Sequence, residues 1–171
     1  MAGSMRNPLA GSTGAGKLAD VELCTRTYDH PDSVKLIADL QQVFVERYGD
    51  EDVTPVDPAQ FAAPLGYFVV GYLDGVPVAC GGWRAHSELE KAAEIKRMYV
   101  AESLRGRGLS RLVLTNLEDT ARAAGHQRMV LETGLRQPEA IGLYLATGYE
   151  RIGNFGVYRD HPESRCFGKS L

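Results

Sequence analysis

The segment Arg105–Ser110, which reads RGRGLS, has the composition of an anion-binding turn. Its two glycines allow a ligand to approach the backbone closely and permit unusual dihedral angles. A helix is expected to start near Leu109, and the N-terminus of a helix presents free N–H groups with a partial positive charge. Arg105, Arg107 and Arg111 add full positive charges. Such a turn is suited to binding a pyrophosphate.

Three interpretations of this turn remain open from its own residues. A dinucleotide-binding fingerprint needs G-x-G-x-x-G, but Arg111 occupies the third glycine position. The segment is also compatible with a plain strand-to-helix turn that carries surface arginines, or with a site for the pyrophosphate of coenzyme A. A second stretch, Gly11–Lys17, reads like the start of a Walker A loop. Because Leu18 follows it and no strand precedes it, we expect no phosphate binding there.

The segments around the turn resemble those of the GNAT superfamily of N-acetyltransferases. The turn itself is similar to the family signature Q/R-x-x-G-x-G/A, with Ser110 in place of the last Gly or Ala. Glu94–Val100 resembles the preceding strand, E-x-x-x-x-x-V. Gln137–Tyr149 resembles the segment N-x-x-A-x-x-x-Y-x-x-x-G-F/Y, with Gln137 in place of Asn. The resemblance covers about residues 20 to 160.

The resemblance implies an α/β fold with a mixed, mostly antiparallel sheet that is flanked by helices and splayed between its two central strands. It also implies that acetyl-CoA is a co-substrate and that its acetyl group passes directly to a primary amine in a ternary complex. The absence of cysteine from the matched motifs agrees with direct transfer rather than an acyl-enzyme. A non-catalytic module that binds acyl-CoA is the alternative, and no metal is expected.

Acetyl transfer requires a base that deprotonates the amine, stabilisation of the developing oxygen charge, and a proton for the departing thiolate. Glu94 is the candidate base, acting directly or through water; alternatively it only pairs with Lys96 or Arg97. Tyr144 is the candidate acid, because the resemblance puts it beside the coenzyme sulfur; alternatively it is a core aromatic residue. The resemblance further implies backbone contacts to the cofactor from Met98 and Val100. The other implied cofactor-binding residues are Tyr99, Arg105, Gly106, Arg107, Gly108, Leu109, Ser110 and Gln137.

Hydrophobic periodicity and turn residues predict the elements that carry these residues. We expect helices on both faces of the sheet. The helix from Pro31 to Gly49 should bury a stripe of Val34, Ile37, Ala38, Phe44, Val45 and Tyr48, and the dipeptide Asp74-Gly75 should close a hairpin. The predicted strands are 20–25, 66–73, 76–85, 92–100, 128–133, 149–157 and 164–171, and the other predicted helices are 109–124 and 138–147. Residues 19–171 should form one domain, after a flexible leader at residues 1–18 that comes in part from recombinant expression.

The composition fits one soluble globular domain. The formal net charge is −3, and the chain has three dispersed cysteines without a C-x-x-C pair. We therefore expect a reduced, cytoplasmic protein without a nucleic-acid or membrane partner, and leave a homodimer open. Residues 96–136 contain eight basic and four acidic residues, whereas residues 19–60 contain three basic and ten acidic ones. The acceptor can be a small-molecule amine or a peptide amine. The acidic segment suggests that it is cationic, or alternatively is only a solvated surface.

Overall fold

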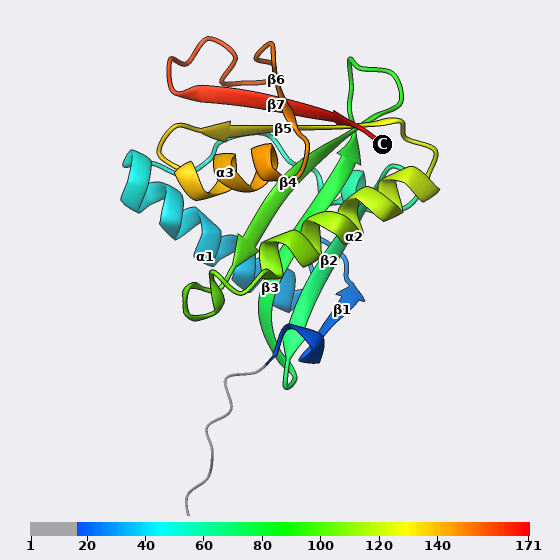
Figure 1. Cartoon of the computed structure of the whole chain (residues 1–171), viewed down its shortest axis with the longest axis vertical. Coiled ribbons are helices and arrows are strands. Elements are labelled where there is room, and N and C mark those ends of the chain that lie inside the picture. Colours follow the sequence, from blue (N-terminus) through cyan, green and yellow to red (C-terminus); the bar gives the residue numbers. More distant parts are fainter. Residues whose placement is uncertain (1–16) are drawn as a thin grey trace, which may run out of the picture.

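The computed structural model describes residues 17–171 and consists of one seven-stranded sheet with helices on both of its faces (Figure 1). The expected leader lies outside the described residues except for Lys17 and Leu18, and so does Gly11–Lys17 except for its last residue. The elements are η1 (Leu18–Asp20), β1 (Val21–Thr25), α1 (Pro31–Tyr48), η2 (Pro58–Phe61), β2 (Gly66–Leu73), β3 (Val76–Ala85), β4 (Ala92–Val100), η3 (Glu102–Leu104), α2 (Leu109–Ala123), β5 (Arg128–Gly134), α3 (Pro138–Ala146), β6 (Glu150–Ile152) and β7 (Ser164–Ser170).

The strands follow the order β1-β2-β3-β4-β5-β7-β6, and within the described residues the only parallel pair is β4 with β5. These two strands pair only where Ala92–Glu94 faces Arg128–Val130. Beyond these positions they diverge, and in Figure 1 they start side by side and separate toward α3. The sheet is therefore mostly antiparallel and splayed between its central strands, as the resemblance implied.

Local residue choices explain the predicted boundaries that the structure confirms. Asp74 and Gly75 have φ angles of 50° and 76°, which is the pair of positive values that a type I′ hairpin needs. Pro31 is the first residue of α1, and Gly49 ends that helix with a φ of 82°. Proline suits a first helical position and glycine suits a left-handed cap, so both ends of α1 were readable from the sequence.

Two hydrophobic clusters fill the two faces of the sheet. On one face, Leu36 of α1 and Phe61 of η2 pack with Phe68 of β2. On the other, α2 and α3 cover the sheet, with Leu117 and Tyr144 in the same cluster. No helix among the described residues is long and apolar enough to cross a membrane.

The buried stripe predicted for α1 is wrong in part. Val34 and Val45 are 52% and 37% exposed, whereas Leu36 and Leu40 are buried. Ser33 is also buried, and its hydroxyl donates to the carbonyl of Thr27 at 2.8 Å. The buried face of α1 is therefore the one that carries Ser33, Leu36 and Leu40, which the predicted stripe left out.

The strand predicted at 149–157 is shorter in the structure, where β6 contains only Glu150–Ile152. The chain then turns, because Asn154 Nδ2 donates to the carbonyls of Arg159 and Ser164, and Gly156 has a φ of 76°. The loop 153–163 thereby leaves the sheet, and it contributes to the site described next.

Candidate active site

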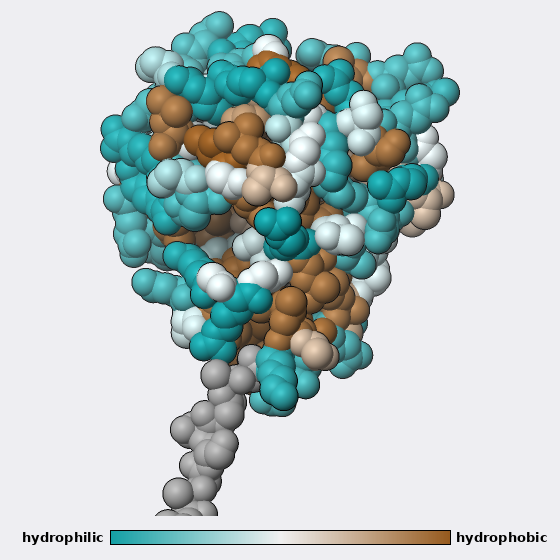
Figure 2. Space-filling view, in the orientation of Figure 1, coloured by the Kyte–Doolittle hydropathy of each residue, from teal (hydrophilic) through white to brown (hydrophobic). Residues whose placement is uncertain are grey.

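The opening between β4 and β5 contains a cleft of about 570 Å³. If the strands stayed paired beyond Glu94 and Val130, Lys96 would face Glu132; instead both side chains line the cleft. Figure 2 shows a recess between α3 and the turn before α2, with hydrophobic residues on its floor. Beyond Glu94, the edge of β4 on the β5 side has no strand partner within residues 17–171. Its backbone N–H and C=O groups can therefore bond a ligand.

The glycine-rich turn forms one end of this cleft. Gly106 and Gly108 have φ angles of 75° and 88°, and Gly108 is the N-cap of α2. Arg105 lies over the ring of Tyr99 at 5.7 Å, and its Nε donates to the carbonyl of Val100 at 3.1 Å. Of the six predicted turn residues, four line the cleft, namely Arg105, Gly106, Gly108 and Ser110, and Arg111 joins them. The side chain of Leu109 is buried in the core, and Arg107 is exposed outside the cleft lining, so the cofactor contacts of these two residues stay predictions.

Residues of β4 and α3 line the middle of the cleft. Met98, Tyr99, Val100, Gln137 and Tyr144 all belong to its lining. The Tyr144 hydroxyl donates to the Met98 sulfur at 3.7 Å. Burial raises the pKa of Tyr144, so this hydroxyl keeps its proton in the folded protein at neutral pH. The role of Tyr144 as the acid stays a prediction.

A bulge in β4 shapes the same region. Cys80 pairs with Tyr99 and Gly82 with Lys96, so two residues of β4, Arg97 and Met98, face only Gly81. Arg97 has a φ of 59°, and its carbonyl accepts from the Cys80 thiol at 3.3 Å. At the bulge, the guanidinium of Arg97 points toward Asp52 and forms a buried ion pair with it. This ion pair connects β4 to the loop after α1.

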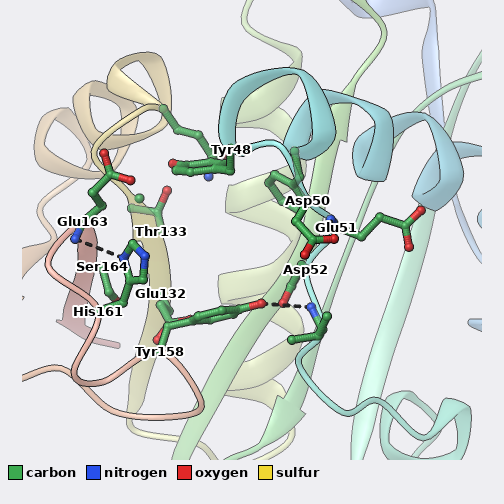
Figure 3. A pocket seen from close by; sticks show the side chains of 14 residues that line it. Tyr48, Asp50, Glu51, Asp52, Glu132, Thr133, Tyr158, His161, Glu163 and Ser164 are labelled. Carbon is green, nitrogen blue, oxygen red and sulfur yellow. Dashed lines mark hydrogen bonds between the residues drawn. The ribbon is translucent and has the colours of Figure 1, made fainter.

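A second cavity, of about 290 Å³, adjoins the cleft. Figure 3 shows Tyr48 and Tyr158 on opposite sides of it, with Asp50 and Asp52 toward the loop after α1. The Val53 N–H donates to the Tyr158 hydroxyl at 2.9 Å, which ties this loop to the loop 153–163. The two cavities share five lining residues, which mark where they meet: Phe44, Asp52, Glu132, Thr133 and Gln137.

The two carboxylates at this junction have opposite pKa shifts. Burial alone would raise the pKa of Asp52, but hydrogen bonds from Thr54 and the charges of Arg97 and Lys96 outweigh burial and lower it. Burial raises the pKa of Glu132, with further contributions from the charges of Asp52 and Glu94, against the opposing effect of Lys96. Two neighbouring carboxyl groups whose pKa values are pushed apart are typical of an acid–base site.

Glu94, the predicted base, lies on the same sheet face but lines neither cavity. It is buried, and its Oε2 accepts from Arg84 Nε at 3.0 Å. Its Oε1 lies 3.2 Å from Lys96 Nζ, the pairing that the sequence offered as the alternative to catalysis. The catalytic role of Glu94 stays a prediction.

The sequence analysis did not identify Glu132, Tyr48 or Tyr158 as site residues; it named Tyr48 only as part of the buried stripe of α1. The available signal for Glu132 was an acidic residue that directly follows the apolar run Met129–Leu131 of a predicted strand. The cavity that these residues line is assembled from three separate segments of the chain, residues 44–53, 132–137 and 158–164. Their proximity depends on the splay of β4 from β5, which no local pattern encodes.

Comparisons with known proteins agree with this geometry. The family described as "Acetyltransferase (GNAT) family" matches residues 34–149. The chain belongs to this family. It is 36% identical over 138 residues to the "IAA acetyltransferase" of Azospirillum brasilense, a match that covers 81% of this chain and 90% of that protein.

Solved structures of GNAT proteins share the fold. A Klebsiella pneumoniae protein assigned as an acyl-CoA N-acyltransferase has a TM-score of 0.75 at 27% identity, over 90% of this chain and 99% of that one. A GNAT acetyltransferase from Elizabethkingia anophelis, solved with acetyl-CoA bound, has a TM-score of 0.64 at 16% identity, over 89% and 99% of the two chains. The protein is thus an acyltransferase of a family whose members act on amine acceptors.

Proposed function

We propose that the protein transfers an acetyl group from acetyl-CoA directly to a primary amine of a small cationic acceptor, within a ternary complex. The observation that carries this proposal is the meeting of two cavities at Glu132: a cleft that runs from a glycine-rich turn along an unpaired strand edge, and a cavity lined by carboxylates.

The coenzyme fits the larger cleft. Arg105 and Arg111 supply positive charge beside Gly106 and Gly108, where the backbone is free to approach a diphosphate. The β4 edge that β5 leaves unpaired can bond the amide groups of the pantetheine arm. The coenzyme supplies an activated thioester, and this chain holds it with the thioester end toward Tyr144.

We propose Glu132 as the base. It lines both cavities at their junction, and its raised pKa makes it a better proton acceptor than an ordinary carboxylate. Glu94 is the second candidate and would have to act through water, because both of its oxygens are occupied by Arg84 and Lys96. The contacts of Glu94 favour a different role, in which this carboxylate holds Lys96 beside the opening between β4 and β5.

Tyr144 is the proposed acid. As the amine nitrogen forms its bond to the acetyl carbon, Glu132 takes a proton from that nitrogen. The carbon–sulfur bond breaks, and the Tyr144 hydroxyl gives its proton to the departing thiolate. Tyr144 then regains a proton from solvent, and Glu132 releases one. Tyr144 lines the cleft, and its hydroxyl contacts the Met98 sulfur; both observations support this role.

The acceptor cavity favours a cation. Five carboxylate residues and two tyrosines line it, whereas its lining contains no lysine or arginine among the described residues. His161 is the one lining side chain that can become positive, and its Nδ1 accepts the Glu163 N–H at 3.2 Å. An anionic acceptor would meet like charge on most sides of this cavity.

Glu132→Gln and Glu94→Gln test the assignment of the base. The assay is thiol release from acetyl-CoA with a panel of amines, measured against pH. Since the base must be ionised, wild-type kcat falls as the pH drops through the raised pKa of Glu132. We expect Glu132→Gln to remove this acidic limb and to lower kcat by about 10²–10⁴-fold. If Glu94→Gln lost the acidic limb of the pH profile while Glu132→Gln stayed active, Glu94 would be the base instead of Glu132.

The same panel of amines tests the charge of the acceptor. If only amines that carry an anionic group were acetylated, the proposal of a cationic acceptor would be contradicted.

A cytoplasmic location and a homodimer belong to this proposal as well. Cys24, Cys80 and Cys166 are all unpaired thiols, which agrees with a reducing compartment. The two edge strands of the sheet, β1 and β6, are where a second copy would add.

A further inference from the structure

We infer that the acceptor is a short diamine, whose second amino group stays protonated and binds in the smaller cavity beside Asp50. The inference rests on the proposed function and specifies the chemistry of the substrate. It follows from the charges that remain on the cavity wall when the reacting nitrogen is neutral.

The reacting amine cannot itself use those charges through the reaction. An ammonium group has no lone pair, so the nitrogen that attacks is neutral, and the amide it becomes is neutral too. A monoamine reaches the cavity as an ammonium and carries positive charge again while the carbon–nitrogen bond forms, so the wall carboxylates attract it only until its last excess proton has gone to Glu132. A diamine keeps a second ammonium that retains its three protons throughout the transfer, so a carboxylate away from Glu132 attracts it at every step.

Asp50 is the carboxylate that is left for this second group. Asp52 pairs with Arg97, and Glu163 pairs with Arg136 at 2.9 Å. Glu51 points away from the space between the two tyrosines in Figure 3. Asp50 pairs with no lysine or arginine among residues 17–171, and its Oδ1 accepts only the N–H of Glu51, at 2.8 Å.

The other walls also suit a cation. The rings of Tyr48 and Tyr158 lie on opposite sides of the cavity (Figure 3), and aromatic faces attract ammonium groups. The Arg136 guanidinium lies 5.7 Å from the centre of the Tyr48 ring, so this ring already makes one cation contact.

Ser164 supplies an independent indication of a ligand. This residue lines the cavity and is only 5% exposed. Its hydroxyl is close enough to Glu132 to favour the ionised form of that carboxyl, yet neither Ser164 Oγ nor Glu132 Oε2 makes a hydrogen bond of ordinary geometry within the described residues. Buried polar atoms normally have partners, and the amino group that approaches Glu132 can donate to both of these oxygens, so they mark the end of the cavity where the reacting nitrogen binds.

The main competitor for this space is a monoamine with an aromatic ring stacked between Tyr48 and Tyr158. It would use the two rings but leave Asp50 without a partner. The number of charges on the acceptor separates the two possibilities, and so the test compares acceptors of similar size that differ in the group at the far end.

The probes are putrescine, n-butylamine, 4-aminobutanol and phenethylamine. Their binding to the full chain is measured by titration calorimetry, and their acetylation by thiol release from acetyl-CoA. We expect wild type to bind putrescine at least tenfold more tightly than the other three. Asp50→Asn should lower the putrescine-to-butylamine affinity ratio about tenfold. Glu46→Gln, which removes an exposed charge of α1 outside both cavities, is the matched control and should leave the ratio as in wild type.

Three outcomes would overturn the inference. Equal affinity of wild type for putrescine and butylamine would contradict it without needing the variant, and acetylation of either amine would then leave the proposed function standing. Preference for phenethylamine would assign the cavity to an aromatic monoamine. Absence of thiol release with every amine would overturn the proposed function, and this inference with it.

Discussion

Replacing Gly134 with alanine tests whether Tyr48 shapes the acceptor cavity. A β-carbon at Gly134 would lie 2.1 Å from the Tyr48 hydroxyl oxygen and 2.8 Å from Cζ, whereas real contacts below 3.0 Å are essentially never found. Gly134 is not among the residues with positive φ, so the alanine backbone itself is not strained. The Tyr48 side chain must therefore move by about 1 Å, the difference between 3.0 and 2.1 Å.

This displacement should affect the acceptor and spare the coenzyme. The Tyr48 hydroxyl would lose its hydrogen bond from the Arg136 N–H, now 3.2 Å long, and the cavity wall would shift. Overpacking of this kind costs about 1–3 kcal/mol, and a misplacement of about 1 Å lowers rates by up to about 100-fold. We expect kcat/KM for the best acceptor to fall about tenfold, whereas the Kd of coenzyme A stays unchanged because neither residue lines the larger cleft.

The assays are thiol release at varied acceptor concentration and calorimetric titration with coenzyme A. The double variant Tyr48→Phe/Gly134→Ala removes the colliding oxygen and should recover part of the loss, compared with Tyr48→Phe alone. An unchanged acceptor kcat/KM in Gly134→Ala would refute the role given to Tyr48. Equal losses of acceptor and coenzyme affinity would show a general disturbance of β5 instead.

Three further predictions address the acid, the diphosphate site and the buried ion pair. Tyr144→Phe should lower kcat by about 10²–10⁴-fold with the Kd of coenzyme A unchanged, as measured by thiol release and calorimetry; a kcat near wild type would remove Tyr144 from the mechanism. Arg111→Gln should weaken coenzyme A binding in the calorimeter, whereas Arg122→Gln, at an exposed position of the same helix, should not; equal effects would argue against the turn as the diphosphate site. Asp52→Asn should cost about 3–5 kcal/mol of unfolding free energy at pH 7, because it leaves Arg97 buried without its partner. Since the pKa of Asp52 is lowered from 3.8, its stabilisation is present above that value and is lost as the pH falls below it, so the gap between wild type and variant in urea denaturation should narrow below pH 3.8.

Much of the fold was readable because short-range chemistry decides it. The bounds of β2, β3 and β4 match the predicted strands, since alternating apolar residues and the Asp74-Gly75 turn act locally. The buried face of α1 was not readable from apolar spacing alone, because apolar residues occur on more than one side of the helix and the polar Ser33 is buried with a hydrogen bond to Thr27. The early end of β6 was missed because apolar residues continue past it, whereas Asn154 bonds carbonyls of the following loop.

The lining of the larger cleft was readable in part from the sequence, and that of the smaller cavity was not. The turn at Gly106 and Gly108 is continuous in sequence, so its residue types suggest an anion site and leave a plain strand-to-helix turn as the alternative. The acceptor cavity joins Tyr48, Glu132 and Tyr158 across more than a hundred residues of chain. Glu132 becomes a candidate base only because β5 leaves β4 after Val130, and this separation is a property of the whole sheet.

A crystal structure of the protein with coenzyme A and putrescine tests the central claim most directly. The account predicts the diphosphate at the turn Gly106–Gly108, the pantetheine arm along the free edge of β4, and the coenzyme sulfur beside the Tyr144 hydroxyl. It further predicts one amino group of putrescine at Glu132. A coenzyme bound elsewhere, or an amine that reaches the sulfur from a side remote from Glu132, would contradict it.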